Sequence, residues 1–176
     1  MPVSAPRFRD ALATVATAVS VATTVDRRGM SCAVTIGSLC ALSLDPPLVL
    51  FCLARDSGSH PVFCAADRFA VTVLAEEQAE VARRCSGLRA ARSSVPLVLV
   101  DRLPVVPGAL AHLLCSTYAL VDGGDHTIVI GEVEHAAVRA GRPLLYHQRD
   151  FQALAPSPGG SGEGSEGFGT ELTRAR

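Results

Sequence analysis

Residues 48–63, LVLFCLARDSGSHPVF, contain a group of side chains that could hold an anion. An apolar run leads into Arg55, hydroxyls follow at Ser57 and Ser59 on either side of a glycine, and Pro61 favours a helix start. A helix N-terminus has unpaired N–H groups and the positive end of the helix dipole, so it favours a phosphate. The same residues also suit a plain helix cap at Ser59, with Arg55 in solvent. Composition alone leaves both interpretations open.

A second group of small polar residues interrupts the apolar run VTIGSLCALSLDPP at residues 34–47. Glycine within a strand often marks the close approach of a ligand to the backbone, and neighbouring hydroxyls could bind a planar polar molecule. The alternative, which the segment on its own favours, is a β-bulge followed by a rigid Asp-Pro-Pro turn. The candidate binding residues of this segment are Thr35, Gly37, Ser38 and Ser43.

A third candidate is His126, which begins an apolar run directly after the turn sequence GGD at residues 123–125. A residue at this point of a hairpin can reach the rim of a barrel, where an imidazole could orient a ligand or transfer a proton. A lone histidine here is also common as a surface turn residue. The sequence contains no H-E-x-x-H or G-x-S-x-G motif, so it gives no support to a metalloprotease or a serine hydrolase.

The charge balance argues against a nucleic-acid partner. All 16 basic residues are arginines, and 17 acidic residues offset them to a formal net charge of −1. The arginines are scattered singly or in pairs and form no basic face. The six cysteines form no C-x-x-C pair and have mostly apolar neighbours, so we expect reduced thiols in a cytoplasmic protein and no metal site.

Residues 11–25 carry no charge and superficially resemble a secretion signal. Asp10 precedes this stretch, five Ser or Thr residues interrupt it, and it is too short to cross a bilayer. We therefore expect neither a signal peptide nor a membrane segment.

Short β-branched or apolar runs separated by turn residues predict a mainly β protein. Segments 60–66 and 76–85 predict helices, and another short helix is expected from about Arg7. Because strands dominate without regular strand–helix alternation, we expect a closed or nearly closed β-barrel with peripheral helices. The predicted domain covers residues 1–154, and the Gly- and Ser-rich residues 155–176 are expected to form a disordered tail. The predicted strands are 19–25, 30–36, 48–54, 69–74, 96–100, 109–121, 127–138 and 144–146.

Together these segments resemble the flavin reductase-like, FMN-binding split-barrel family. The resemblance covers about residues 7–154, and its most specific parts are SLDPP and GDH…GEV at their separation in this chain. The matching segments, in order, are FRDALATVATAVSVATT, LCALSLDPPLVLFCLARDSGS, RFAVTVLAEEQAEVARR, LPVVPGALAHLLCSTYALVDGGDHTIVIGEV and PLLYHQRDF.

The resemblance implies a role for each candidate. His126 matches a family histidine near the nicotinamide, and Tyr146 lies in a stretch that helps to bind the pyridine nucleotide. Relatives often carry aromatic residues where this chain has Leu39 and Cys85, so less stacking surface is expected near the flavin, which favours a transiently bound flavin. The flavin-binding residues that the resemblance implies are Thr35, Ile36, Gly37, Ser38, Ser43 and Arg84 for the ring, and Arg55, Ser57 and Ser59 for the phosphate.

The implied activity is that of an NAD(P)H:flavin oxidoreductase, which transfers a hydride from NADH or NADPH to FMN or FAD. The reduced flavin would then pass to a partner flavin-dependent monooxygenase, in secondary metabolism, including antibiotic biosynthesis, or in the oxidation of aromatic compounds. The resemblance also implies a homodimer. The alternative is a non-catalytic flavin-binding carrier or sensor built on the same barrel.

Overall fold

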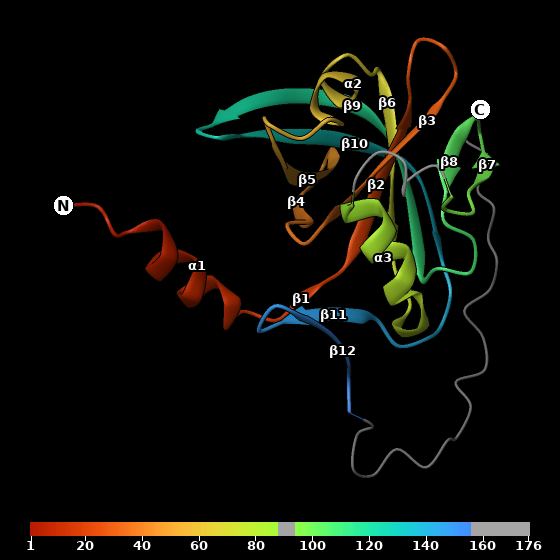
Figure 1. Cartoon of the computed structure of the whole chain (residues 1–176). Helices are drawn as coiled ribbons and strands as arrows, with labels where there is room; N and C mark the ends of the chain where they lie inside the picture. Colours follow the sequence, from red (N-terminus) through yellow and green to blue (C-terminus); the bar gives the residue numbers. More distant parts are fainter. Residues whose placement is uncertain (88–93, 156–176) are drawn as a thin grey trace.

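Figure 1 shows the computed structural model, which describes residues 1–87 and 94–155. Antiparallel strands dominate it, as the short apolar runs predict. The strands of the largest sheet are β2 (Ser20–Val25), β3 (Ser31–Ile36), β4 (Cys40–Leu44), β5 (Pro47–Ala54), β6 (Arg68–Val73), β9 (Ala111–Gly123) and β10 (His126–Val138). Their order in this sheet is β3-β2-β6-β9-β10-β5-β4.

The remaining described elements surround this sheet. A small sheet in the order β1-β11-β12 lies at the bottom of the view in Figure 1. Its strands are β1 (Thr17–Ala18), β11 (Leu144–His147) and β12 (Asp150–Ala153). The other elements are α1 (Ala5–Ala13), α2 (His60–Cys64), the 3-10 turn η1 (Glu76–Gln78), α3 (Ala79–Ser86) and the hairpin β7 (Val98–Val100)–β8 (Leu103–Val105).

Two glycine turns close hairpins of the large sheet, and the second confirms the turn predicted at residues 123–125. Gly29 has φ +75° between β2 and β3, and Gly124 has φ +76° between β9 and β10. Both values lie in the left-handed region, which glycine adopts without the steric cost that a Cβ atom brings. The second turn places His126 at the very start of β10, directly across from Ala54 at the end of β5.

Several segments differ from the expected strands, and β8 and β12 were not predicted at all. The expected strand 19–25 is divided. Before β2 begins, the N–H of Val19 donates to the carbonyl of Leu144 in the smaller sheet, and the carbonyl of Val19 accepts the N–H of Leu74. Residues 40–44, expected as part of an interrupted strand or a bulge, form β4 with a register shift between Ala41 and Ser43. The bulge is therefore present, but it lies inside a paired edge strand.

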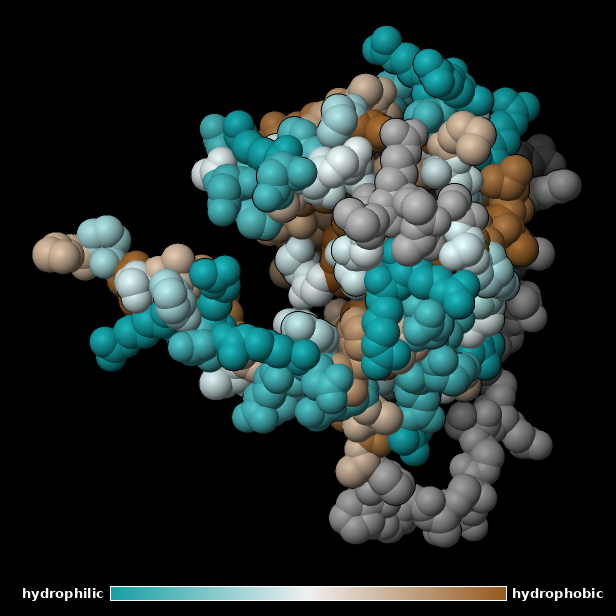
Figure 2. All heavy atoms as spheres, in the orientation of Figure 1, coloured by the Kyte–Doolittle hydropathy of each residue, from teal (hydrophilic) through white to brown (hydrophobic). Residues whose placement is uncertain are grey.

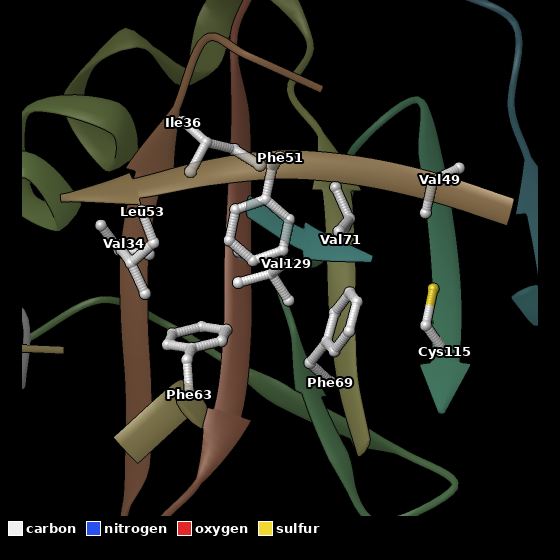
Figure 3. Packing of buried hydrophobic residues seen from close by; sticks show 11 residues of the cluster. Val34, Ile36, Val49, Phe51, Leu53, Phe63, Phe69, Val71, Cys115 and Val129 are labelled. Atoms are coloured by element: carbon white, nitrogen blue, oxygen red, sulfur yellow. The ribbon is translucent and has the colours of Figure 1, made fainter. Parts of the chain in front are cut away.

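The core shows why the sheet curls into a barrel. In Figure 3, Val34 of β3 and Leu53 of β5 lie in the same cluster, although β3 and β5 are far apart in the strand order. Phe51 packs edge-on against Phe63 and Phe69, with ring centroids 5.9 Å and 5.5 Å away. Side chains from both ends of the sheet thus bury one interior, and this confirms the predicted mainly β barrel.

Two helices contribute in opposite ways. One face of α3 buries Ala82 and Cys85 in a second core cluster with Val19 and Val21. The family resemblance predicted that position 85 faces the ligand, and this is wrong, because the helix turns Cys85 into the core. By contrast, α1 has no buried residue and projects away from the barrel (Figure 1).

Further expectations concern the C-terminal tail, membrane segments, metal sites and the cysteines. The disordered tail predicted for 155–176 lies outside the described residues from 156 onward. Among the residues described, no helix is long and apolar enough to span a membrane, and no His, Cys, Asp and Glu cluster suited to a metal occurs. None of the six cysteines forms a disulfide with another described residue.

Candidate functional site

A hollow of about 420 Å³, called here the first hollow, opens where the end of β3 meets the end of β5 and the start of β10. This volume lies in the usual range for small-molecule sites. Six residues predicted as binding or catalytic line it, namely Thr35, Ile36, Gly37, Ser38, Ser57 and His126. The other lining residues are Val34, Cys52, Leu53, Ala54 and Ser86.

The backbone at Gly37 and Ser38 forms a polar part of this wall. Both residues follow β3, and their N–H groups have no acceptor among the residues that the structure describes. A Cβ atom built on Gly37 would lie 3.2 Å from Thr17 Oγ1, which is tighter than ordinary contact. Glycine therefore leaves the backbone bare here, where two N–H donors can meet a ligand.

The hydroxyls beside this backbone hold the wall in place. Thr35 Oγ1 donates to the carbonyl oxygen of Ala82 on α3, 2.7 Å away. Ser38 Oγ accepts a hydrogen bond from the N–H of Cys52 at 2.9 Å and so joins the end of β3 to β5. These side chains fix the position of the wall, and the unbonded backbone N–H groups are the donors that remain for a ligand.

The loop after β5 places the predicted phosphate residues at different depths. Ser57 lines the first hollow, and its Oγ accepts the N–H of Ser59 at 3.3 Å. Arg55 follows the lining residue Ala54, and its guanidinium forms an ion pair with Asp122 at 2.9 Å. Ser59 takes the N-cap position of α2 without a side-chain cap bond and is completely buried. The loop thus places Ser59 at the buried start of α2 and the guanidinium of Arg55 at the rim of the first hollow.

A hydrogen bond that the sequence did not predict ties α2 to the start of β10. The ring Nε2 of His60 lies 2.8 Å from Thr127 Oγ1, next to His126. Cys64 Sγ lies 3.4 Å from the same nitrogen, and burial raises the pKa of this thiol although the charge of Arg55 opposes the shift. A neutral thiol is a poor nucleophile, so this pair serves packing of the helix.

His126 has a fixed partner on its own turn. Its Nδ1 lies 2.7 Å from Asp125 Oδ1, and this hydrogen bond holds the pKa of Asp125 below its ordinary value of 3.8. The carboxylate is therefore ionised at neutral pH and can only accept, so Nδ1 carries the hydrogen. The other ring nitrogen, Nε2, is left available to a molecule in the first hollow.

A second hollow of about 360 Å³ adjoins the first and shares Thr35, Ile36, Gly37 and Ser86 with it. Tyr146, the predicted pyridine-nucleotide residue, lines this second hollow. Its ring packs against Phe151 with centroids 5.3 Å apart, and the guanidinium of Arg83 lies 5.2 Å from the Phe151 centroid. The remaining lining residues are Val19, Arg149 and Asp150.

Four predicted residues line neither hollow, namely Arg55 and Ser59 of the loop after β5, described above, and Arg84 and Ser43. Arg84 turns toward Glu80, with its Nε 3.0 Å from a carboxylate oxygen. Ser43 lies on β4, where its hydroxyl accepts the N–H of Asp45 at 3.2 Å. The neighbouring Arg83 lines the second hollow and not the first, because successive residues of a helix point about 100° apart.

Simple periodicity carries a signal for the lining residues that the sequence analysis missed. Phe51 and Leu53 point into the core, so Cys52 between them faces the other side of β5, toward the first hollow. On α3, Ala82 and Cys85 are buried, and Arg83 and Ser86 lie three residues apart on a neighbouring face.

Known proteins with similar sequences and structures agree with this arrangement. The family model for the flavin reductase like domain matches residues 12–155. FMN reductase (NADH) SmoA of Agrobacterium fabrum is 40% identical over 140 residues, which cover 79% of this chain and 80% of the relative. The flavin-dependent monooxygenase reductase subunit HsaB of Rhodococcus jostii is 35% identical over 157 residues, covering 85% and 78%.

A solved structure shares the whole fold. The NADH:FAD oxidoreductase SgcE6 of Streptomyces globisporus, determined in complex with NAD and FAD fragments, superposes with a TM-score of 0.81 at 32% identity. The match covers 90% of this chain and 99% of that one. Barrel, hollows, family model and relatives together show that this chain belongs to the flavin reductase like domain family.

Proposed function

We propose that this protein is an NADH-dependent flavin reductase that reduces FMN and releases it to a partner monooxygenase. The observation that carries this proposal is the pair of adjoining hollows, whose common wall is Thr35, Ile36, Gly37 and Ser86. Transfer between two bound molecules requires adjoining sites that hold both in contact. The activities named for the relatives support this function.

The first hollow fits a flavin. It combines apolar side chains such as Val34 and Leu53 with two unbonded backbone donors at Gly37 and Ser38. At the other end lie the Ser57 hydroxyl and, at the rim, a guanidinium, which together suit a phosphate. A bound flavin would supply the two-electron acceptor chemistry, which the protein's own side chains lack.

The chain's own contribution is orientation and electrostatics. The N–H groups of Gly37 and Ser38 would donate hydrogen bonds to the flavin ring and stabilise the negative charge gained on reduction. The ionised Asp125 holds the imidazole of His126 in one orientation and leaves Nε2 to contact the nicotinamide or to hold a proton. These residues need form no covalent bond to a substrate.

The second hollow suits the pyridine nucleotide. Tyr146 and Phe151 offer aromatic surface, and Arg83 offers a cation to the phosphates. In the part of the chain that the structure describes, no Phe or Tyr lines the first hollow. The flavin would therefore gain little from stacking, which supports a flavin that binds transiently as a substrate and leaves once reduced.

Exposed apolar residues support a homodimer. Helix α1 carries Phe8 and Leu12, and Val15 follows its end, each about half exposed; β4 carries Leu42 and Leu44 at 46% and 93% exposure. Such surfaces are costly in water and are typical of contacts between subunits. The absence of disulfides among the described residues suits a reducing cytoplasm, where NADH is available.

The proposal is tested by filling the first hollow from its wall. Cys52→Phe projects a large side chain into the hollow, and Ala137→Phe on exposed β10 surface serves as the matched control. We expect Cys52→Phe to lose FMN binding, measured by calorimetry, and anaerobic NADH oxidation together. The control should keep both, and thermal unfolding shows that each variant is folded. Normal FMN binding and turnover in folded Cys52→Phe would contradict this assignment of the flavin site.

A further inference from the structure

Helix α1 contacts the turn between β11 and β12. The N–H of Gln148 in this turn donates to the carbonyl oxygen of Ala13 at 2.8 Å, and Nη2 of Arg149 donates to the carboxylate of Asp10. In Figure 1 the C-terminal end of α1 lies beside this turn, and Figure 2 shows hydrophilic residues where α1 meets the small sheet. One backbone bond and one ion pair therefore join α1, which buries no residue of its own, to the turn.

The backbone of this turn is strained. Its two central residues lie in the left-handed region, with φ +49° at Gln148 and +66° at Arg149. A two-residue hairpin turn with positive φ at both positions ordinarily carries Asn or Gly, because other side chains crowd the backbone there. Residues held in this region are common at ligand sites, where surrounding contacts keep them in place. At the β11–β12 turn, α1 supplies such contacts.

The same turn forms part of the wall of the second hollow. Arg149 and its neighbour Asp150 line this hollow together with Arg83. The carboxylate of Asp150 is engaged locally, because its Oδ1 accepts the N–H of Phe151 at 2.8 Å. With two guanidinium groups against one carboxylate, the lining has a net positive charge and complements the phosphates of a nucleotide.

Asp10 engages only part of the Arg149 guanidinium. The contact is made through Nη2, and Nε and Nη1 have no acceptor among the residues that the structure describes. A guanidinium holds its donors in a fixed planar fork, so a partner on one nitrogen sets the direction of the other two. Asp10, which does not line the second hollow, can thus orient a cation that does, and it leaves two nitrogens for a ligand.

We propose that Asp10 is a positioning residue for the pyridine nucleotide: it holds Arg149 so that Nε and Nη1 contact the nucleotide phosphates in the second hollow. Asp10 itself touches neither the nucleotide nor the flavin. Without its carboxylate, the Arg149 side chain samples more rotamers, and binding a phosphate must restrict them at a cost in affinity. The proposal rests on the proposed function, because it names a further residue that serves the nucleotide site.

The test uses variants of the full chain. Asp10→Asn removes the charge and keeps the size of the side chain. Asp101→Asn is the matched control, because Asp101 pairs with Arg68 at 2.6 Å on a turn that also has left-handed residues, yet it lines neither hollow. The side chains of Asp10 and Asp101 are 67% and 62% exposed. We expect Asp10→Asn to raise the dissociation constant of NAD⁺ about threefold by calorimetry, and Asp101→Asn to leave it unchanged.

A double-mutant cycle decides whether Asp10 acts through Arg149. Arg149→Ala should raise the dissociation constant of NAD⁺ about tenfold, because it loses a charged contact to a phosphate, and adding Asp10→Asn should then change nothing further. Asp10→Glu restores a carboxylate and should return the affinity to within about twofold of the wild type. In steady-state assays KM for NADH should follow the same factors, while kcat and FMN affinity stay within about twofold.

Several results would overturn the proposal. A loss from Asp10→Asn that is as large in the Arg149→Ala background as in the wild type would show that α1 acts without Arg149. Tighter NAD⁺ binding in Asp10→Asn would show that the carboxylate competes with the nucleotide for Arg149. Unchanged binding in both Asp10→Asn and Arg149→Ala, or an equal loss in Asp101→Asn, would also contradict it. Thermal unfolding shows that each variant is folded. Failure of the proposed function would look different, since the wild type would then not oxidise NADH with FMN.

Discussion

Replacing His126 with alanine tests the contact between the chain and the nicotinamide. The ring nitrogen Nε2 is the group removed, because Nδ1 is already bonded to Asp125 at 2.7 Å. A hydrogen bond between neutral groups contributes about 0.5–1.5 kcal/mol, which is about twofold to twelvefold in an equilibrium constant. The His126 side chain is 42% exposed, so water can replace part of the lost contact. We therefore expect kcat/KM for NADH to fall by about threefold to tenfold.

The assay is steady-state NADH oxidation with saturating FMN, combined with calorimetric FMN binding. FMN affinity should change by less than about twofold, because the flavin contacts proposed here come from the backbone at Gly37 and Ser38. Asp125→Asn provides a second variant. It keeps an acceptor oxygen beside Nδ1 and loses the charge, so its loss in kcat/KM should be smaller than that of the alanine variant.

The pH dependence of kcat/KM for NADH tests the role of Asp125 separately from that of His126. Asp125 has a lowered pKa, so its carboxylate is ionised throughout assays above its ordinary value of 3.8 and is neutralised only as the pH falls below that value. Ring orientation should therefore stay constant across neutral pH. An unchanged kcat/KM for NADH in His126→Ala, or a loss of FMN affinity as large as the loss in NADH use, would refute this role.

Three further predictions concern other parts of the molecule. Arg83→Ala should raise KM for NADH by about threefold to tenfold, whereas Arg84→Ala, whose guanidinium is paired with Glu80, should leave it unchanged; equal effects in steady-state assays would contradict the second hollow. Leu44→Asp should raise the dissociation constant of the proposed dimer at least about a hundredfold, measured by light scattering. Burying one leucine contributes about 1.5 kcal/mol or more, and a two-fold interface contains this leucine twice. An unchanged dissociation constant would show that β4 is not part of the interface. Burial lowers the pKa of His112 below 6.5, so near and below this pH the unfolded chain binds more protons at this residue than the folded chain does. The free energy of unfolding should therefore keep its full value above pH 6.5 and decline as the pH falls toward the folded pKa. Thermal unfolding of His112→Gln should lack this decline, and identical pH curves for the two proteins would contradict the prediction.

Local patterns predicted most of the strands and the hairpin turn at residues 123–125. The apolar run of β5 and the turn before β10 are visible in the sequence, so the barrel class and the position of His126 could be predicted. The pairing of His126 with Ala54 could not be predicted, because it depends on the register between β10 and β5, which are far apart in the chain.

The limits of the sequence are clearest on α3. The family resemblance placed Arg84 beside the flavin, and the structure brings Arg83 to the second hollow. A shift of one residue turns a helical side chain by about 100°, and only the packing of Ala82 and Cys85 into the core decides which arginine lines the second hollow. Likewise, Ser59 is polar in the sequence but completely buried, because α2 packs Phe63 into the barrel.

If the two adjoining hollows hold NADH and FMN in contact, each chain reduces one flavin after another. The most direct test mixes the protein with NADH and a large molar excess of FMN in the absence of oxygen and follows the absorbance of oxidised flavin. The account predicts that each chain reduces many flavins, with Cys52→Phe inactive and Ala137→Phe active. Reduction of no more than one flavin per chain would contradict it and would instead identify a flavin-binding carrier.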